Sequence, residues 1–326
     1  MNAERIVFDA AAGGGNRIVA FICPATTGDI KGVFQICHGM TDHFGRYEEM
    51  TDYLNSKGWH VCGLDMLGHG ETWKTNIGNN MPKGFFGAGK DSAECILRDE
   101  MKLHRIVKER FGDGLDYVLY GHSMGSFIVR NMYIDRKYSD EFDRFIFAST
   151  MGPNPGVGAG LALSRITNLF GQRRKPGKLI NIIAFKPYNK RIDHPKTSFD
   201  WLSTDDEEIR KYTEDEMAGF LFTSKGFTDL FTLISRMQSS KAYRDLPDKP
   251  AFMPYGEEDP VGGYGKGVRK VEERLRAAGA DITVKDYGHY RHELQHEPVR
   301  YEYFDDIDRF ASGQEITVTQ GEENGI

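Results

Sequence analysis

Apolar and polar positions follow one another in blocks, and these blocks predict a regular succession of strands and helices. From the third predicted strand onward the apolar runs are continuous, which indicates strands covered on both faces of a parallel sheet. The first two strands are joined by a glycine-rich turn at 13–16, which is typical of a hairpin. The eight predicted strands are residues 4–9, 17–23, 32–37, 59–65, 116–120, 144–149, 251–255 and 282–287.

Amphipathic stretches between these runs predict helices. Apolar residues recur at helical spacing in residues 46–57, 91–111, 264–278 and 298–311. The second of these helices opens with Asp91 and Glu94, which have the spacing of a capping box. The alternation predicts an α/β fold, with a mostly parallel eight-stranded sheet and helices on both of its faces.

One long segment interrupts the alternation. Residues 152–246 contain no clear strand apart from a weak candidate at 179–185. We therefore expect an α/β core formed by residues 1–151 and 247–312, with a helical cap inserted after the sixth strand. The polar residues 313–326 are expected to form a frayed C-terminal tail.

Three helices are predicted inside this cap. Thr204 and Glu207 have capping-box spacing at the start of one of them. The other two are indicated by apolar residues at helical spacing. These include Leu161, Ile166, Leu169 and Phe170 in the first helix, and Phe227, Leu230, Phe231, Ile234 and Met237 in the second. Such residues pack any cap on its core, but Phe227, Phe231 and Ile234 are also candidates for binding an acyl chain.

A nucleophile motif lies between the fifth strand and the helix after it. Residues 121–125 read Gly-His-Ser-Met-Gly, which is the Gly-x-Ser-x-Gly nucleophile elbow in the strand–turn–helix context that it requires. The sharp turn is expected to hold Ser123 in a strained backbone conformation. Gly121 and Gly125 fit there because a side chain would collide with the neighbouring strand and helix.

A serine nucleophile needs a base and a carboxylate that orients the base, and both must come from loops at the carboxyl ends of strands. The loop after the seventh strand supplies Asp259, which we favour over Glu257 and Glu258. The loop after the eighth strand supplies His292, favoured over His289 for its position before the following helix. The order serine, acid, histidine is that of α/β-hydrolases.

The tetrahedral intermediate of acyl transfer needs backbone N–H donors aimed at its oxyanion. Met124 directly follows the nucleophile and supplies one such donor. Met40, in the turn after the third strand, is expected to supply the other, because Gly39 permits a tight backbone there.

Taken together, four motifs resemble the monoacylglycerol lipase and lysophospholipase branch of the α/β-hydrolases. They are His38-Gly39-Met40 with Arg46-Tyr47, residues 65–70, residues 121–125, and residues 291–294. The resemblance implies the α/β-hydrolase fold, with Ser123 as nucleophile, Asp259 as acid, His292 as base, and Met40 and Met124 as the oxyanion hole. The chain departs from the family at Glu71-Thr72, and that loop is expected to form the floor of the site.

Residues 292–296 also match His-Glu-x-x-His, in which two histidines on one helix face bind zinc while the glutamate acts as a base. Pro298 leaves room for only a very short helix. No third ligand follows at a family-like spacing. We therefore expect neither a metal nor an organic cofactor.

The composition sets the broad class and excludes some partners. The 326 residues are 39% hydrophobic and 28% charged, and their formal net charge is −6, which suits a globular protein and argues against nucleic acid. Such a charge does nothing to attract an anionic membrane, and the basic residues 173–175 either meet a phosphate headgroup or form a solvated loop. Without a signal sequence or a transmembrane segment, we expect a cytoplasmic protein whose four cysteines are buried thiols.

The sequence thus predicts a serine carboxylic-ester hydrolase that acts on a small lipid-like ester, such as a monoacylglycerol or a lysophospholipid. An aminopeptidase of the same superfamily stays open, because the acidic residues 205–208 would suit the amino terminus of a peptide. The zinc peptidase and a non-catalytic ligand-binding protein of this fold are more remote alternatives. The cap is also a candidate for transient contact with a membrane surface.

Overall fold

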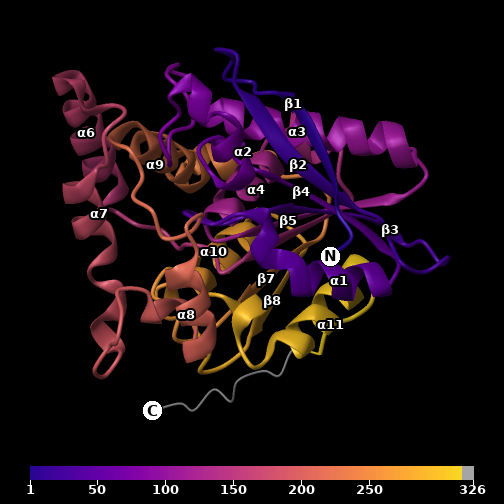
Figure 1. Cartoon of the computed structure of the whole chain (residues 1–326). Coiled ribbons are helices and arrows are strands. Elements are labelled where there is room, and N and C mark those ends of the chain that lie inside the picture. Colours follow the sequence, from indigo (N-terminus) through magenta and orange to yellow (C-terminus); the bar gives the residue numbers. More distant parts are fainter. Residues whose placement is uncertain (318–326) are drawn as a thin grey trace, which may run out of the picture.

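The computed structural model describes residues 1–317, which form one eight-stranded sheet (Figure 1). The strand order is β1-β2-β4-β3-β5-β6-β7-β8. β1 and β2 form an antiparallel hairpin, β2 pairs antiparallel with β4, and all other neighbours are parallel. All eight predicted strands are confirmed. Their bounds are β1 Glu4–Asp9, β2 Arg17–Cys23, β3 Gly32–Cys37, β4 Trp59–Asp65, β5 Asp116–His122, β6 Arg144–Ala148, β7 Ala251–Tyr255 and β8 Ile282–Asp286.

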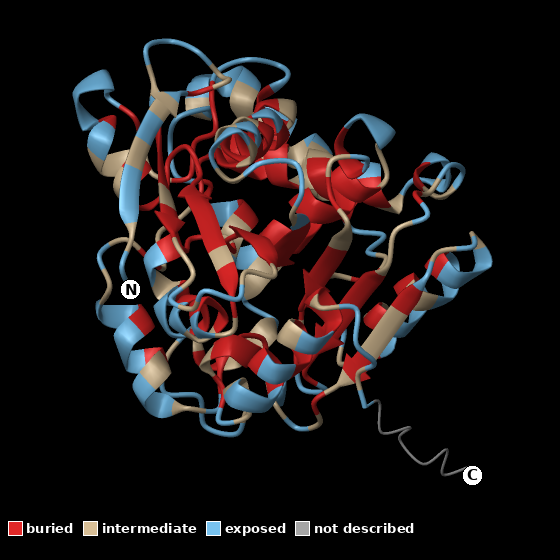
Figure 2. Cartoon of the chain, turned by 90° about the vertical axis from the view of Figure 1, so that its right-hand side faces the viewer, coloured by how far each residue is buried: buried red, intermediate tan, exposed pale blue. Residues whose placement is uncertain are grey.

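Helices cover both faces of the sheet, as the alternating pattern predicted. α1 and α11 share a hydrophobic cluster with one face, whereas α3, α4 and α10 share a second cluster with the other. Figure 2 shows the central strands buried between these layers, with the outer helix faces exposed. The core helices are α1 Glu48–Ser56, α2 Gly70–Thr75, α3 Ser92–Phe111, α4 Met124–Tyr133, α5 Arg136–Ser139, α10 Lys266–Ala277 and α11 Arg300–Ala311.

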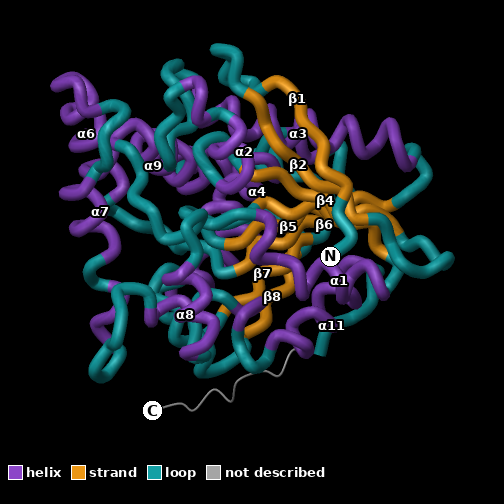
Figure 3. The backbone as a smooth tube through the Cα atoms, in the orientation of Figure 1, coloured by secondary structure: helices purple, strands orange, loops and turns teal. Residues whose placement is uncertain are grey.

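The chain between β6 and β7, which we call the β6–β7 segment, contributes no strand to the sheet among the described residues and consists of helices and loops (Figure 3). The strand candidate at 179–185 is wrong, since these residues lie in a helix. A short apolar run does not distinguish a strand from a helix by periodicity alone. The α-helices of the segment are α6 Val157–Thr167, α7 Lys178–Phe185, α8 Asp206–Glu214 and α9 Ser224–Gln238.

Two predicted helix caps are wrong because the side chains have other partners. α8 is capped by Asp205, whose carboxylate accepts the N–H of Glu207 at 2.9 Å. Thr204 hydrogen-bonds instead to the carboxylate of Glu297, far along the chain. Asp91 precedes α3 without capping it, and its carboxylate pairs with an arginine one to two turns into the helix at 3.0 Å.

The four cysteines are buried and unbonded, as predicted. Burial raises the pKa of each of these thiols, which keeps them protonated at neutral pH. Among the helices of residues 1–317, none combines the length and the apolar composition needed to cross a bilayer.

Candidate active site

The turn between β5 and α4 holds Ser123 in the strained conformation that the elbow motif predicted. Its φ is 54° and its ψ is −118°, a positive φ that is rare for a residue with a side chain. A Cβ on Gly121 would lie 2.3 Å from the carbonyl oxygen of Gly125, and a Cβ on Gly125 would lie 2.0 Å from that of Cys37. Both positions therefore require glycine, and the tight turn presents Ser123 at the end of the strand.

Asp259 and His292 face each other in the loops after β7 and β8. His292 Nδ1 lies 2.9 Å from Asp259 Oδ1, although the Nδ1–H bond does not point straight at that oxygen. The same oxygen accepts the N–H of Val261 at 2.8 Å, which fixes the carboxylate. The two favoured candidates are thus brought together in the interior. The three alternatives from the same loops are all exposed, namely Glu257, Glu258 and His289.

The backbone of His292 is hydrogen-bonded to the end of β5 and to the residue that follows β6. Its carbonyl oxygen accepts hydrogen bonds from Ser149 Oγ at 2.6 Å and from His122 Nε2 at 3.1 Å. Burial, together with the neighbouring His292, lowers the pKa of His122 to about 4, so this ring is neutral at pH 7. Its proton sits on Nε2, because a carbonyl can only accept. Since His122 directly precedes Ser123, the bond holds the loop of His292 beside the elbow.

The loop after β3 passes close to Ser123. A Cβ on Gly39 would lie 3.6 Å from the Cβ of Ser123, so no side chain separates the two backbones. The N–H groups of Met40 and Met124 have no hydrogen-bond acceptor among residues 1–317. His38 fixes the loop, since its Nδ1 donates to the carbonyl of Gly39 at 2.8 Å and its Nε2 accepts a backbone N–H at 3.0 Å. Burial lowers its pKa, which favours the neutral ring that this pattern needs.

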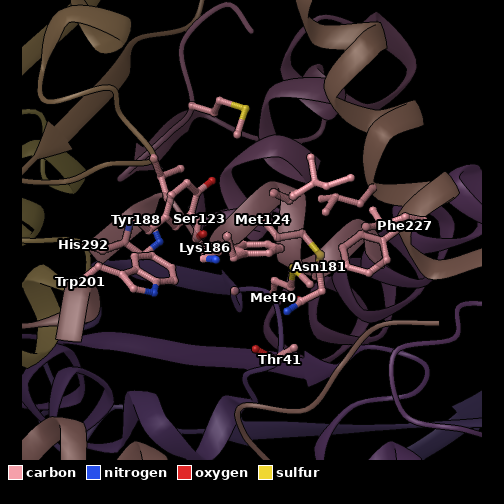
Figure 4. Close-up of a pocket in the computed structure, with 18 of the residues that line it drawn as sticks. Met40, Thr41, Ser123, Met124, Asn181, Lys186, Tyr188, Trp201, Phe227 and His292 are labelled. Carbon is pink, nitrogen blue, oxygen red and sulfur yellow. The ribbon is translucent and has the colours of Figure 1, made fainter. Parts of the chain in front are cut away.

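A cavity of about 790 Å³ connects these groups with the β6–β7 segment. Figure 4 shows Ser123, His292 and Trp201 at one end of the cavity and Phe227 at the other. The candidate substrate residues Phe227, Phe231 and Ile234 all line it, as do Met40 and Met124. Apolar residues of α6, α7 and α9 contribute much of the remaining lining.

The expectation that the loop at 65–72 forms the floor of the site is wrong, because this loop does not line the cavity. Thr72 lies against β2, where its Oγ accepts the N–H of Val19 at 2.7 Å. Asp65 accepts the N–H groups of Phe44 and Glu71, each at 2.7 Å. The loop therefore fastens to β2 and to the backbone of Phe44, and Glu71-Thr72 does not touch the space available to a ligand.

A buried ion network joins two loops of the site, and the sequence did not reveal it. Arg46 donates two hydrogen bonds to Glu293, at 2.8 and 2.7 Å, and a third to Asp42 at 3.1 Å. Burial acts to raise the pKa of Glu293, but the guanidinium outweighs it and the pKa lies below its usual value. Glu293 follows His292 and Asp42 lies two residues after Met40, so the network ties the loop of His292 to the loop of Met40. Arg46 and Glu293 belong to the motifs noted in the sequence, but nothing there paired them.

The β6–β7 segment also reaches the site. The ring of Trp201, in the short helix η5 (Asp200–Leu202), lies 4.9 Å from the ring of His292 between centroids. Arg291 donates to two backbone carbonyls of the same turn, each at 2.8 Å. The N–H of Glu293 donates to a third at 2.7 Å. These bonds fasten the segment to the loop of His292 across about ninety residues of sequence.

The His-Glu-x-x-His match does not place its two histidines on one helix. His292 lies in a loop, and only Leu294–His296 form a single 3-10 turn. The Nδ1 of His296 faces Glu208 at 3.3 Å, whereas that of His292 faces Asp259. Within the part of the chain that the structure describes, no three His, Cys, Asp or Glu side chains are grouped to hold a metal ion.

The sheet order, the strained serine at the end of β5 and the aspartate–histidine pair after β7 and β8 define an α/β-hydrolase. Residues 28–299 match the family model described as "Serine aminopeptidase, S33". This match covers most of the chain, so the chain belongs to that family, and it is a hydrolytic enzyme.

Individual relatives confirm the resemblance drawn from the motifs. A monoacylglycerol lipase of Mycolicibacterium smegmatis is 26% identical over 310 residues, which cover 94% of this chain and 97% of the relative. A thermostable carboxyl esterase from Bacillus coagulans, solved in complex with glycerol, has a TM-score of 0.87 at 26% identity and covers 96% of this chain and 99% of its own. A monoglyceride lipase from Saccharomyces cerevisiae shares the fold, with a TM-score of 0.71 at 17% identity over 97% and 96% of the two chains.

Proposed function

We propose that this enzyme is a serine carboxylic-ester hydrolase that acts on lipid-derived esters of the monoacylglycerol or lysophospholipid kind. The observation that carries the proposal is the largely apolar cavity of about 790 Å³ that is lined by Ser123 and His292. Small-molecule sites span about 300 to 1,000 Å³, so this one accepts a ligand of lipid size. The names of the relatives, an esterase and lipases, support the same substrate class.

In the proposed mechanism, Ser123 Oγ attacks the ester carbonyl carbon while His292 Nε2 takes the hydroxyl proton. Asp259 stabilises the resulting imidazolium through Nδ1. The N–H groups of Met40 and Met124 receive the oxyanion of the tetrahedral intermediate. The proton then passes to the alkoxide that leaves, and a water molecule hydrolyses the acyl-enzyme with the same groups in the same roles.

Residues 152–246 serve, on this proposal, as a cap over the site. Phe227 of α9 lies at the end of the cavity far from Ser123, and Phe231 and Ile234 of the same helix also line the cavity, so an acyl chain would lie along this helix. Trp201 of η5 packs against the catalytic histidine and shields it from solvent. The cap would thus both bind the apolar part of the substrate and keep the reacting groups dry.

The acidic groups in and near the cavity are already paired, and this favours an ester substrate over a peptide with a free amino terminus. The lining carboxylates Asp42 and Glu293 are both bound to Arg46, so neither is free to bind an ammonium group. The acidic residues 205–208 do not line the cavity. Their carboxylates cap α8 or pair with basic side chains nearby. A peptide's ammonium group would therefore lose its hydration without gaining a partner.

The test is intact-mass analysis after exposure to a fluorophosphonate probe. The wild-type protein and the exposed-serine control Ser240→Ala are expected to gain one adduct, with or without a chelator, whereas Ser123→Ala gains none. An adduct on Ser123→Ala, or none on the wild type, would contradict the assigned nucleophile. Hydrolysis of a monoacylglycerol is then compared with that of an aminoacyl anilide, and a preference for the anilide would favour the aminopeptidase.

A further inference from the structure

The wall of the active-site cavity carries few full charges, and one of them has no partner in the described chain. Among residues 1–317, the carboxylate, ammonium and guanidinium side chains that line the cavity are Asp42, Lys186 and Glu293. Both carboxylates are bound to Arg46. The ammonium group of Lys186 forms neither an ion pair nor a hydrogen bond with a described residue. The cavity wall therefore presents one positive charge without an internal counter-charge.

Two neutral polar side chains close to Lys186 in the sequence also line the cavity. The side-chain amide of Asn181 and the hydroxyl of Tyr188 form no hydrogen bond within residues 1–317. The ring of Tyr188 packs edge-on against Trp201, with 4.8 Å between the centroids, which fixes the direction of the hydroxyl. Desolvation raises the pKa of Tyr188, so the phenol keeps its proton and can donate a hydrogen bond. One short stretch of chain thus offers an ammonium group, an amide and a phenol hydroxyl to a ligand.

Lys186 lies toward the end of the cavity where the reaction would take place. Figure 4 shows it on the side of Ser123 and Trp201, with Phe227 at the opposite end. The apolar wall around Phe227 suits an acyl chain. The alcohol part of a bound ester would then remain at the end that holds Lys186.

The surrounding stretch of sequence offers no acidic side chain to this ammonium group. Residues 149–192 contain no Asp or Glu. The basic residues 173–175 were candidates for meeting a phosphate headgroup, but none of them lines the cavity. Both arginines among them donate to backbone carbonyls instead. Lys186 is therefore the basic residue of this stretch that a substrate inside the cavity can reach.

A structural role for Lys186 is the alternative. It stands directly after the last residue of α7, where a positive charge is favourable beside the negative end of the helix dipole. This role explains a lysine at the end of a helix, but it does not explain the two unbonded polar groups on the same cavity wall. The two roles can be separated, because a helix cap affects stability whereas a ligand contact affects the choice of substrate.

We propose that Lys186, Asn181 and Tyr188 bind a phosphate group on the alcohol part of the substrate, so that the enzyme prefers phosphorylated lipid esters to neutral ones. A phosphate supplies the missing negative charge, and its oxygens accept hydrogen bonds from all three side chains. The hydroxyl of a neutral monoacylglycerol at the same position leaves the ammonium group without a counter-charge. This site rests on the proposed function, in that the substrate is a lipid ester whose carbonyl Ser123 attacks.

The experiment compares two esters, hexanoyl glycerol and hexanoyl glycerol phosphate, each used below the concentration at which it forms micelles. The quantity measured is kcat/KM for the phosphate ester divided by kcat/KM for the neutral ester, because effects common to both substrates cancel in this ratio. Lys186→Gln removes the charge, Lys186→Arg keeps it, and Tyr188→Phe removes only the hydroxyl. Lys190→Gln is the matched control, since Lys190 is also exposed and unpaired within residues 1–317 but does not line the cavity.

For the wild type we expect a ratio above one that falls at high salt, because salt screens the attraction between the charges. Lys186→Gln should lower the ratio about tenfold, as the loss of a charge-assisted hydrogen bond does. Tyr188→Phe should lower it by a smaller factor. Lys186→Arg should restore most of the wild-type ratio, and Lys190→Gln should leave it unchanged.

A wild-type ratio at or below one would overturn the proposed phosphate site, and so would a ratio that Lys186→Gln leaves unchanged. A lower Tm of Lys186→Gln with the wild-type ratio would assign Lys186 to the end of α7 alone. Calorimetric binding of both esters to Ser123→Ala provides the same comparison without turnover. Preferential binding of the phosphate ester without hydrolysis of either ester would therefore refute the proposed function alone, whereas equal hydrolysis of both would refute only the phosphate site.

Discussion

Replacing Arg46 with methionine tests the idea that one buried cation holds two loops of the active site together. The change removes the positive charge that faces Asp42 and Glu293, which are only 2% and 3% exposed. Breaking a buried ion pair by deleting one partner costs about 3 to 5 kcal/mol, because the other charge is left without compensation. For a chain of this length, unfolding entropy converts that loss into a fall of about 4 to 8 °C in Tm.

The loss should depend on pH in a direction that the structure fixes. In the wild type, Arg46 holds the pKa of Glu293 low, so the stability that this carboxylate contributes is complete above its unfolded pKa of about 4.3. In Arg46→Met, the guanidinium that opposed the effect of burial on Glu293 is absent, so the pKa of this carboxyl group rises above its unfolded value. The variant then regains stability as the pH falls and the carboxylate is protonated. We therefore expect a larger difference in Tm between the two proteins at pH 8 than at pH 5.

Thermal unfolding at both pH values provides the measurement. Arg210→Met is the matched control, since Arg210 also contacts two carboxylates, Glu207 and Glu214, but all three are exposed. Its Tm should match that of the wild type. Arg46→Met should also slow the reaction of Ser123 with a fluorophosphonate, because the loops of the site lose their link. An unchanged Tm, or an equal fall at both pH values, would refute the reasoning.

Three further substitutions test separate parts of the structure. Gly125→Ala would place a Cβ 2.0 Å from the carbonyl oxygen of Cys37, so it should destabilise the fold by about 3 kcal/mol or more, and a wild-type Tm would count against the elbow geometry. Asp259→Asn should keep the Tm but lower the ester turnover about 10⁴-fold, and a fall of less than tenfold would remove Asp259 from the triad. Burial raises the pKa of Glu100 from 4.5 to about 8, so the wild type should lose stability relative to Glu100→Gln as the pH rises between these values, and parallel Tm curves would contradict this.

The sequence by itself determined the parts of this protein that depend on local patterns. Strands such as 32–37 and 116–120 are continuous apolar runs bounded by turn residues, and a parallel strand covered on both faces requires that pattern. The elbow at 121–125 could be identified because glycine, serine and glycine at this spacing, between a strand and a helix, fit the tight turn that presents a nucleophile. Asp259 and His292 could be chosen because parallel strands bring the loops at their carboxyl ends to one edge of the sheet.

Other features were decided only by tertiary contacts between distant residues. The partner of Arg46 lies 247 residues further along the chain, and no periodicity records such a pairing. Thr204 has the local spacing of a helix cap, but the fold offers it Glu297, and the carboxylate is the stronger partner. The short run at 179–185 lies in α7, and the β6–β7 segment contributes no strand to the sheet among the described residues.

The exposed apolar side chains of residues 166–183 show the same division between local pattern and tertiary contact. Ile166, Leu169 and Phe170 have the helical spacing that usually marks a buried face, and the sequence could not say which neighbour would cover them. The structure packs α6 and the turn after it, Asn168–Gln172, on α9 and leaves Leu169 and Phe170 of that turn in solvent. Local pattern determines which elements form, whereas burial depends on which surfaces meet, and that is a property of the whole fold.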